Sequence, residues 1–118
     1  MTEFHTFLIA DDHPQVRSLI RDILDAPGRT FVECGDGAAA IEAHIQHQPD
    51  ITLIDIEMPV MDGLTATRSI VQRCPDACVV IVTQFDDNRI KKLSLATGAK
   101  AFLPKSQLHI LPSFLSEL

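Results

Sequence analysis

The sequence predicts an α/β protein built on a doubly wound, five-stranded parallel sheet. Its most informative stretch is the apolar run from Ile51 to Ile54, which lies between Pro49-Asp50 and Pro59 and ends abruptly at Asp55. Continuous hydrophobicity without alternation is typical of a strand that helices cover on both faces. Runs of this kind alternate with helical patterns along the chain. The short connections between them require right-handed crossovers and therefore parallel strands.

The first strand and the first helix follow one another at the N-terminus. A strand is expected from Phe4 to Ala10, where Asp11-Asp12 ends it. The helix opens at Pro14, with Asp12 or His13 as its cap, and stops at Pro27-Gly28. Five apolar residues repeat at helical spacing along its inner face, namely Val16, Leu19, Ile20, Ile23 and Leu24.

The middle of the chain repeats this strand and helix pattern twice. A short strand from Thr30 to Cys34 leads through Gly35-Asp36-Gly37 into an alanine-rich helix that Pro49 ends. The third strand is the run that ends at Asp55. After it, Met61-Asp62-Gly63 starts a helix, and Cys74-Pro75 ends that helix.

The last third of the chain contains two strands and two helices. Cys78 to Thr83 is the most strand-like run, because it is β-branched almost throughout. A fourth helix is expected from about Asp87 to Gly98, followed by a fifth strand from Ala101 to Leu103. Proline does not fit deep inside a helix, so Pro112 places the start of the last helix near Ile110.

Length, charge and cysteine content narrow the class of protein. The 118 residues suit one domain, and the formal net charge of -6 argues against non-specific binding to nucleic acid or to an anionic membrane. No apolar run is long enough to span a bilayer, and the N-terminus lacks a signal-peptide pattern, so a cytoplasmic location is expected. The odd number of cysteines, Cys34, Cys74 and Cys78, argues against a disulfide framework.

Polar residues follow four of the predicted strands. Asp11, Asp12 and Asp55 would share one edge of the sheet if the first and third strands are neighbours. Three gathered carboxylates suit a hard divalent cation such as Mg²⁺, with Mn²⁺ as a possible substitute. Thr83 adds a hydroxyl and Lys105 an ammonium. Together these groups are suited to phosphoryl transfer, with a carboxylate as the nucleophile that becomes an aspartyl phosphate.

In this pattern the sequence resembles a response regulator receiver domain over essentially its whole length. The resemblance rests on Asp11-Asp12, on Asp55 with Met58-Pro59 and Asp62-Gly63, on Thr83, and on Pro104-Lys105. The run from Gly98 to Ser106 further resembles the subfamily with a C-terminal helix-turn-helix DNA-binding domain. The family implies a flavodoxin-like fold with strand order 2-1-3-4-5. It also implies that residues 1–118 form the receiver domain, and the short last helix, which stops on Leu118, suggests that this domain is trimmed from a longer chain.

The resemblance also implies a role for each matching residue. Asp55 would accept a phosphoryl group from a histidine kinase, while Asp11, Asp12, Asp55 and the backbone carbonyl of Glu57 would hold Mg²⁺. Lys105 and Thr83 would bind phosphoryl oxygens. The domain would then be no enzyme beyond its own phosphorylation and dephosphorylation, and it would not itself bind DNA.

Three features depart from the family pattern, the third of them involving two residues. The aromatic switch position holds Phe102 instead of tyrosine, so it has no phenol hydroxyl. Gln84 replaces the usual small residue after Thr83, and its bulk could hinder access to Asp55. Phe85 and Glu57 occupy positions where the family tunes attack by water. We therefore expect Gln84 and Phe85 to lengthen the lifetime of the phosphorylated form.

Other interpretations of the same residues stay open at this stage. A receiver-like module could act by docking alone, without phosphorylation. Gly35-Asp36-Gly37-Ala38-Ala39-Ala40 also matches the G-x-G-x-x-A dinucleotide fingerprint, with Asp55 twenty residues after Gly35 as a ribose ligand. His44 and His47, three apart on a helix and expected to be exposed, form a weak candidate metal pair. The last helix carries more apolar residues than one stripe can bury, which suggests a homodimer or contact with a further domain.

Overall fold

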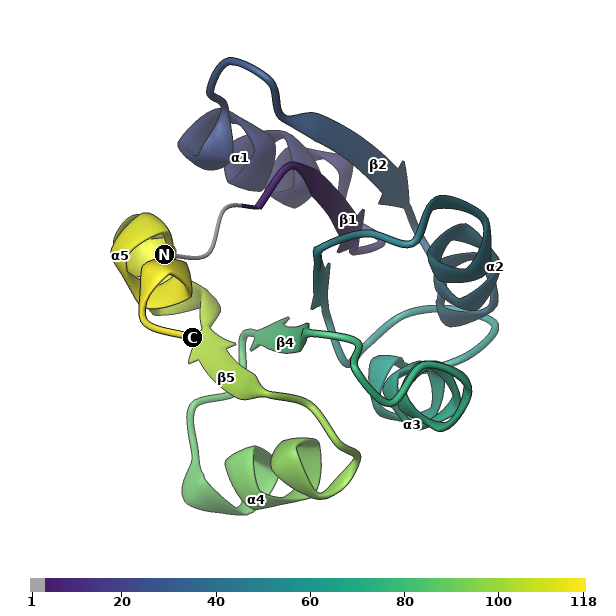
Figure 1. Cartoon of the computed structure of the whole chain (residues 1–118). Helices are drawn as coiled ribbons and strands as arrows, with labels where there is room; N and C mark the ends of the chain where they lie inside the picture. Colours follow the sequence, from purple (N-terminus) through teal and green to yellow (C-terminus); the bar gives the residue numbers. More distant parts are fainter. Residues whose placement is uncertain (1–3) are drawn as a thin grey trace.

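A parallel sheet of five strands forms the centre of the molecule (Figure 1). The computed structural model describes residues 4–118. The strand order is β2-β1-β3-β4-β5, as expected. The strands are β1 (Thr6–Ala10), β2 (Thr30–Cys34), β3 (Ile51–Ile54), β4 (Val79–Thr83) and β5 (Ala101–Pro104). The predicted strands are confirmed with small shifts at their ends, the largest being the start of β1 at Thr6 instead of Phe4.

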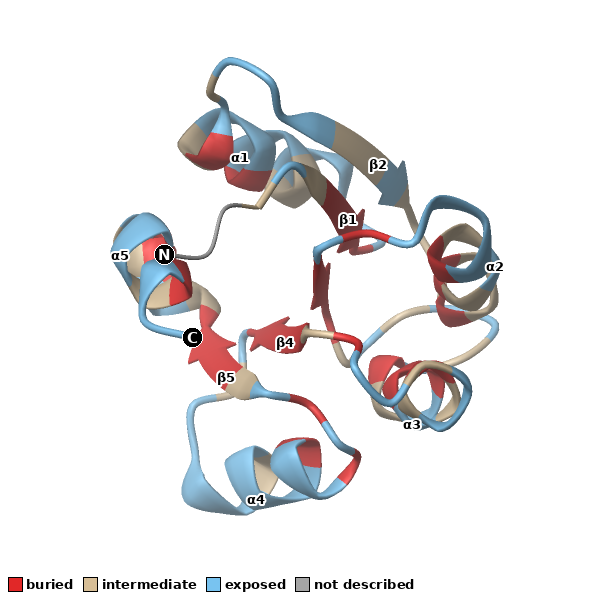
Figure 2. Ribbon diagram, in the orientation of Figure 1, coloured by how far each residue is buried: buried red, intermediate tan, exposed pale blue. Residues whose placement is uncertain are grey.

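Helices cover both faces of this sheet (Figure 1). They are α1 (Pro14–Leu24), α2 (Gly37–His47), α3 (Gly63–Arg73), α4 (Asn88–Ala96) and α5 (Leu111–Ser116), with a 3₁₀ helix η1 (Lys105–Ile110) before α5. Side chains of α1 and α5 pack on one face in a cluster that includes Ile20 and Leu111. Side chains of α2, α3 and α4 pack on the other face around Ala40 and Ile70. The central strands are accordingly buried on both sides, whereas β2 at the edge is partly exposed (Figure 2).

The chain turns back between β1 and β3, and this reversal determines where the polar strand ends meet. From β1 the chain moves outward to β2, and then returns to pair β3 with the other side of β1, with Ala10 opposite Ile54. In a doubly wound sheet the crevice for a ligand lies at this reversal, beyond the carboxyl ends of the strands. Asp11 directly follows β1 and Asp55 directly follows β3 at this edge of the sheet.

Three helices begin with an aspartate that caps the first turn. The carboxylates of Asp36, Asp62 and Asp87 accept hydrogen bonds from the backbone N–H groups of Ala39, Thr65 and Ile90, respectively. These bonds satisfy donors that have no partner within the helix. At α1 the structure confirms His13, one of the two expected caps, as the N-cap residue. Its side chain makes no capping bond, and its backbone N–H donates to the carboxylate of Asp11.

The last helix is short and begins where Pro112 allows it. Pro112 lies in the first turn of α5, where a missing N–H costs nothing. Leu111 and Leu115 are buried, and Ile110 and Phe114 pack against the same core cluster. Among the apolar residues of this segment, Leu118 is exposed. The core therefore buries most of the apolar side chains of the last helix, which the sequence predicted to be more than the core could bury. Within residues 4–118, no helix has the length and apolar character required to cross a membrane.

Candidate phosphoacceptor site

Four adjacent strands deliver polar side chains to one edge of the sheet. Asp11 and Asp12 follow β1, Asp55 follows β3, Thr83 ends β4 and Lys105 follows β5. Since β1, β3, β4 and β5 are consecutive neighbours, their carboxyl ends form a continuous row. The sheet order thus brings together residues that are up to 94 positions apart in the sequence, from Asp11 to Lys105.

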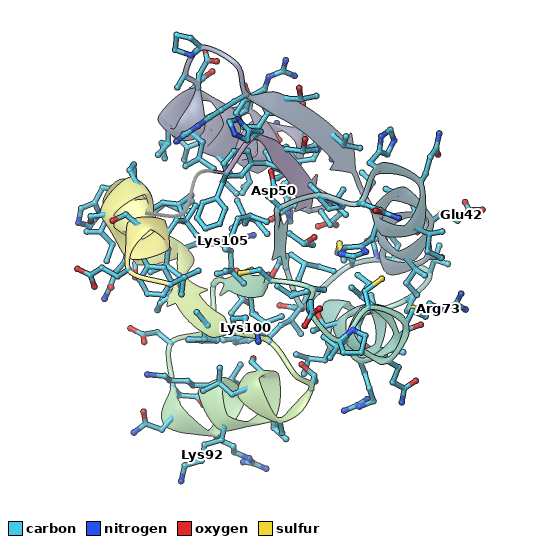
Figure 3. All side chains as sticks on the ribbon, viewed as in Figure 1. Glu42, Asp50, Arg73, Lys92, Lys100 and Lys105 are labelled. Carbon is cyan, nitrogen blue, oxygen red and sulfur yellow. The ribbon has the colours of Figure 1, made fainter. Side chains whose placement is uncertain are left out.

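The Lys105 ammonium joins two buried carboxylates. Its Nζ lies 2.8 Å from Oδ2 of Asp11 and 2.9 Å from Oδ2 of Asp55. In Figure 3 Lys105 is near the centre of the molecule, whereas Glu42, Arg73 and Lys92 point outward. Burial alone would lower the pKa of Lys105, but the hydrogen bonds and charges of Asp11 and Asp55 outweigh it and raise the pKa. Lys105 is therefore a fixed positive charge within reach of both carboxylates.

Asp55 is buried and held on both of its oxygens. Only 4% of the residue is exposed. Oδ1 accepts a hydrogen bond of 2.7 Å from the backbone N–H of Ile56, and Oδ2 is paired with Lys105. These two contacts fix the rotamer of a carboxylate that faces the ends of the neighbouring strands. The carboxylate of Asp55 is therefore held in one orientation.

His13 completes a group of four side chains that sequence reasoning did not assemble. Its Nδ1 lies 3.2 Å from Oδ1 of Asp11 and 3.0 Å from Oδ1 of Asp12. Candidate ligand atoms of Asp11, Asp12, His13 and Asp55 all lie within 4.8 Å of one another. The position of His13 directly after the acidic pair was a signal that could have identified it.

The donor set of this group fits a divalent cation. Three carboxylates converge there, two of them buried, and the described part of the chain supplies Lys105 as a cation in direct contact with those two. Oxygen donors of this kind suit hard ions that bind through one or two carboxylates and keep several waters. Asp12 and Glu57 also line one shallow depression beside the group.

Thr83 presents a buried hydroxyl at the end of β4. The residue is fully buried, and within residues 4–118 its Oγ1 has no hydrogen-bond partner. A buried polar group without a partner costs free energy and calls for a specific explanation. Thr83 ends β4, which pairs with β3, the strand that leads into Asp55.

Phe102 and Phe85 differ in their surroundings. Phe102, on β5, is buried in the same cluster as Ile90 of α4. Phe85, in the loop before α4, is half-buried. The predicted switch residue therefore packs inward, between the sheet and α4.

A side-chain bridge joins the two loops beside Asp55. The Gln84 amide donates a hydrogen bond of 2.9 Å from Nε2 to Oε1 of Glu57. Gln84 belongs to the loop between β4 and α4, and Glu57 to the loop between β3 and α3. Two residues that the sequence singled out separately are thus in direct contact.

The glycine-rich segment after β2 serves the fold. Gly37 donates its backbone N–H to the Met61 carbonyl at 3.1 Å, and a Cβ at Gly37 would overlap that carbonyl. The segment follows β2, an edge strand, whereas the dinucleotide fingerprint belongs to the central strand at the reversal point. Asp55 is engaged with Lys105. The geometry therefore argues against the dinucleotide interpretation.

The histidine pair on α2 differs from the expectation of two exposed side chains. His47 is exposed, but His44 is buried, and burial lowers the pKa of its imidazole.

Cys34 and Cys78 are half-buried free thiols. Burial raises the pKa of both thiols, and it raises the pKa of Cys34 to about 11. At that pKa the Cys34 thiol is an inert packing group at neutral pH.

Comparisons with known proteins agree with this geometry. The family model described as "Response regulator receiver domain" matches residues 7–110. Chemotaxis protein CheY of Bacillus subtilis is 36% identical over 102 residues, which cover 86% of this chain and 85% of that protein. Oxygen regulatory protein NreC of Staphylococcus carnosus is 37% identical over 102 residues, covering 84% of this chain and 47% of NreC. A protein-glutamate methylesterase of Hahella chejuensis is 36% identical over 110 residues, which cover 91% of this chain but only 32% of that protein.

Solved structures give the same result. The response regulator domain of Thermotoga maritima CheB superposes with a TM-score of 0.85 and 28% identity, covering 98% of this chain and 93% of that one. The signal receiver domain of the putative regulator NarL from Mycobacterium tuberculosis gives a TM-score of 0.82 and 28% identity, with 98% of each chain covered. The chain belongs to the response regulator receiver domain family.

Proposed function

We propose that this domain is the phosphoacceptor of a two-component response regulator and that Asp55 receives a phosphoryl group from a histidine kinase. The observation that carries the proposal is the environment of Asp55. It is a buried carboxylate that lies between an ammonium and two further carboxylates, at the end of a strand next to an unpaired buried hydroxyl. Such a set of groups positions a nucleophile and neutralises charge on transferred oxygens.

The chemistry follows from these positions. A carboxylate oxygen of Asp55 attacks the phosphorus of the donor phosphohistidine, and the phosphorus–nitrogen bond breaks. The released imidazole keeps that electron pair and takes a proton from solvent. Lys105, already 2.9 Å from Asp55, is placed to pair with a phosphoryl oxygen. A bound Mg²⁺, held by Asp11, Asp12, Asp55 and the Glu57 carbonyl, would supply positive charge against the phosphoryl oxygens.

The signal would leave the site through Thr83 and Phe102. The Thr83 hydroxyl has no hydrogen-bond partner among residues 4–118, so a phosphoryl oxygen on Asp55 would offer it one. Movement of Thr83 toward Asp55 would change the space beside Phe102, which lies on the adjacent strand and packs against α4. We propose that this contact biases a two-state equilibrium of the surface formed by α4, β5 and α5.

We further propose that the output is transcriptional and that the domain works in the cytoplasm as part of a longer chain. The chain spans about half of NreC and about a third of the Hahella methylesterase. The relatives include regulators named for transcription, such as DegU of Brevibacillus brevis, and also proteins of chemotaxis. The proposed C-terminal domain would bind the DNA, and the acidic receiver domain would not. We also propose that the domain forms a homodimer, with the exposed α4 residues Leu93 and Leu95 as candidate contacts.

Docking without phosphorylation is the alternative function. The bridge from Gln84 to Glu57 favours it, because that bridge joins the two loops beside Asp55 and would have to open if a phosphoryl donor approached between them. In that case the carboxylates of Asp11, Asp12 and Asp55 would serve only to hold the loops in place.

Intact-mass spectrometry with acetyl phosphate separates the two functions. The parent and Asp55→Asn are incubated with the donor in Mg²⁺ and in EDTA. One added phosphoryl group that requires both Mg²⁺ and Asp55 is the expected result. A parent that gains no mass in Mg²⁺ would favour the docking module.

A further inference from the structure

Arg17, in the first turn of α1, reaches back to the chain that leaves β1. Its Nη1 donates a hydrogen bond of 2.6 Å to the backbone carbonyl of Asp11. The side chain is only 20% exposed, and Nη1 also lies near the backbone of Gly35, since a Cβ there would be 3.6 Å from it. The guanidinium thus lies between the turn that follows β1 and the turn that follows β2.

Glu33 on β2 holds the Arg17 guanidinium in this place. Its Oε1 accepts a hydrogen bond of 3.1 Å from Nε of Arg17, and its Oε2 accepts one of 3.1 Å from Nη1 of Arg21. A guanidinium is a rigid planar fork, so the bond from Nε to Glu33 also sets the direction in which Nη1 points. Both arginines therefore share one carboxylate, and of the two it is Arg17 that bonds to Asp11.

The carbonyl that Arg17 contacts belongs to the peptide group between Asp11 and Asp12. On the other side of Asp11 the chain is fixed by the sheet, because the Asp11 backbone N–H donates to the Cys34 carbonyl at 3.0 Å. The bond from Arg17 therefore fixes one peptide group beyond the pairing of β1 with β2. A peptide group is planar, so its orientation sets the direction in which the chain enters Asp12.

We infer that Arg17 is a positioning residue of the cation site, which orients the peptide group before Asp12 so that the Asp12 carboxylate is directed toward the ion. The inference rests on the proposed function, because it takes Asp12 as a ligand of Mg²⁺. Lys105 contacts carboxylate oxygens, whereas Arg17 contacts a backbone carbonyl, so the two cationic side chains act on different atoms. Residues that orient metal ligands typically contribute a factor of about ten or more to metal affinity.

The direction of the effect separates positioning from electrostatics. Arg17 carries a positive charge beside the carboxylates that follow β1, and a positive charge repels a metal ion. By charge alone, its removal would strengthen Mg²⁺ binding. If Arg17 positions Asp12, its removal weakens Mg²⁺ binding in spite of the lost repulsion.

The test measures Mg²⁺ affinity directly, without phosphorylation. Mn²⁺ is titrated into the 118-residue protein and followed by electron paramagnetic resonance, and Mg²⁺ affinity is obtained by competition. The variants are Arg17→Gln, Arg17→Lys and Asp12→Ala. Arg21→Gln is the matched control, because it removes an arginine from the same Glu33 carboxylate. Nuclear magnetic resonance of the Asp12 backbone N–H reports on the peptide group that Arg17 contacts.

The expected result is weaker Mg²⁺ binding in the Arg17 variants only. Arg17→Gln should weaken it by about tenfold and shift the Asp12 amide resonance, whereas Arg21→Gln should stay within about twofold of the parent. Arg17→Lys keeps the charge without the rigid fork, so it should weaken binding by less than Arg17→Gln does. In phosphorylation by acetyl phosphate, Arg17→Gln should raise the half-saturating Mg²⁺ concentration and change the rate at saturating Mg²⁺ by less than about twofold.

Unchanged or tighter Mg²⁺ binding in folded Arg17→Gln would overturn the inference. If urea denaturation shows that Arg17→Gln is unfolded, Arg17→Lys decides by the same criterion. A large loss of affinity in Asp12→Ala with none in Arg17→Gln would overturn the role of Arg17 alone. If Asp12→Ala also binds Mg²⁺ as the parent does, the cation site of the proposed function fails together with it.

Discussion

Gln84 directly follows Thr83 in the loop after β4, and its amide is bonded to Glu57 in the loop that follows Asp55. We predict that Gln84→Ala shortens the lifetime of the aspartyl phosphate, because the loops on either side lose the bond that joins them. One hydrogen bond of this kind corresponds to a rate change of about two- to tenfold. The measurement is loss of the phosphoryl mass over time after removal of the donor.

Gln107→Ala is the matched control, because Gln107 is exposed and belongs to η1 outside the bridge. Adding Phe85→Ala to Gln84→Ala should accelerate the loss further, since Phe85 is a half-buried apolar residue of the same loop. A double variant that dephosphorylates no faster than the parent would show that neither residue controls water entry.

Val60 holds an unfavourable backbone conformation at the surface. Its φ is +69°, in the left-handed region that β-branched residues rarely occupy, and its side chain is 84% exposed. Val60→Asn should raise the free energy of unfolding by about 1 kcal/mol, because asparagine tolerates this conformation and little packing is lost. Urea denaturation measures the change. Val60→Ile keeps the β-branched side chain, so a similar gain in that variant would contradict the explanation by strain.

At the scale of elements, helix α2 packs a histidine against the rest of the molecule. His44 is buried, and burial lowers the pKa of its imidazole. The unfolded chain therefore binds a proton more readily than the folded one, and stability falls as pH drops below the unfolded pKa of about 6.5. One such proton contributes a slope of at most about 1.4 kcal/mol per pH unit.

We predict that His44→Gln reduces the change in the free energy of unfolding between about pH 7 and pH 5. Carboxylates titrate mainly below this range, so they contribute little to the slope within it. Urea denaturation at each pH measures the slope. His47→Gln provides the comparison, because His47 is exposed on the same helix. If both variants keep the slope of the parent, protonation of His44 is not its source.

The connection between β3 and α3 depends on the absence of a side chain at Gly63. Its backbone N–H donates to the Ile56 carbonyl, and a Cβ at this position would overlap the carbonyl of Asp55. Gly63→Ala should therefore lower the free energy of unfolding by more than about 2 kcal/mol, since backbone would have to move. It should also impair phosphorylation, because the displaced backbone belongs to Asp55 itself.

Gly35→Ala is the contrasting change. A Cβ at Gly35 would meet its nearest neighbour at 3.6 Å, an ordinary contact, so we expect a change of less than about 0.5 kcal/mol. Thermal and urea denaturation of both variants, with mass spectrometry of phosphorylation, give the comparison. Equal effects of the two substitutions would show that glycine is needed in both places for another reason.

For the whole molecule, the sequence predicted the sheet because its signals were local and consistent. The β-branched run at Val79–Thr83 and the capping aspartates each specify one element without help from distant residues. The strand order and the proximity of Asp11, Asp55 and Lys105 came from the family resemblance, and the structure agrees with them. Side-chain contacts between loops, such as the hydrogen bond from Gln84 to Glu57, depend on side-chain conformation and cannot be predicted from the periodicity of the sequence. The burial of His44 was missed because its polarity suggested an exposed face.

The acidic edge of the sheet links cation binding to the stability of the whole domain. Two buried carboxylates share Lys105, and Asp12 adds a third negative charge beside them. A cation that binds only the folded state raises the free energy of unfolding by about 1.4 kcal/mol for each tenfold increase above its dissociation constant. We predict such a rise when Mg²⁺ is titrated in urea denaturation experiments, and its loss in EDTA.

The dependence on Asp12 distinguishes this effect from a general action of salt. Asp12→Asn removes one proposed ligand and should abolish most of the rise, whereas Asp22→Asn removes an exposed charge on α1 and should leave it intact. General screening would stabilise both variants equally, because the net charge of -6 is reduced by one in each. An undiminished Mg²⁺ effect in Asp12→Asn would therefore place the stabilising cation away from the end of β1.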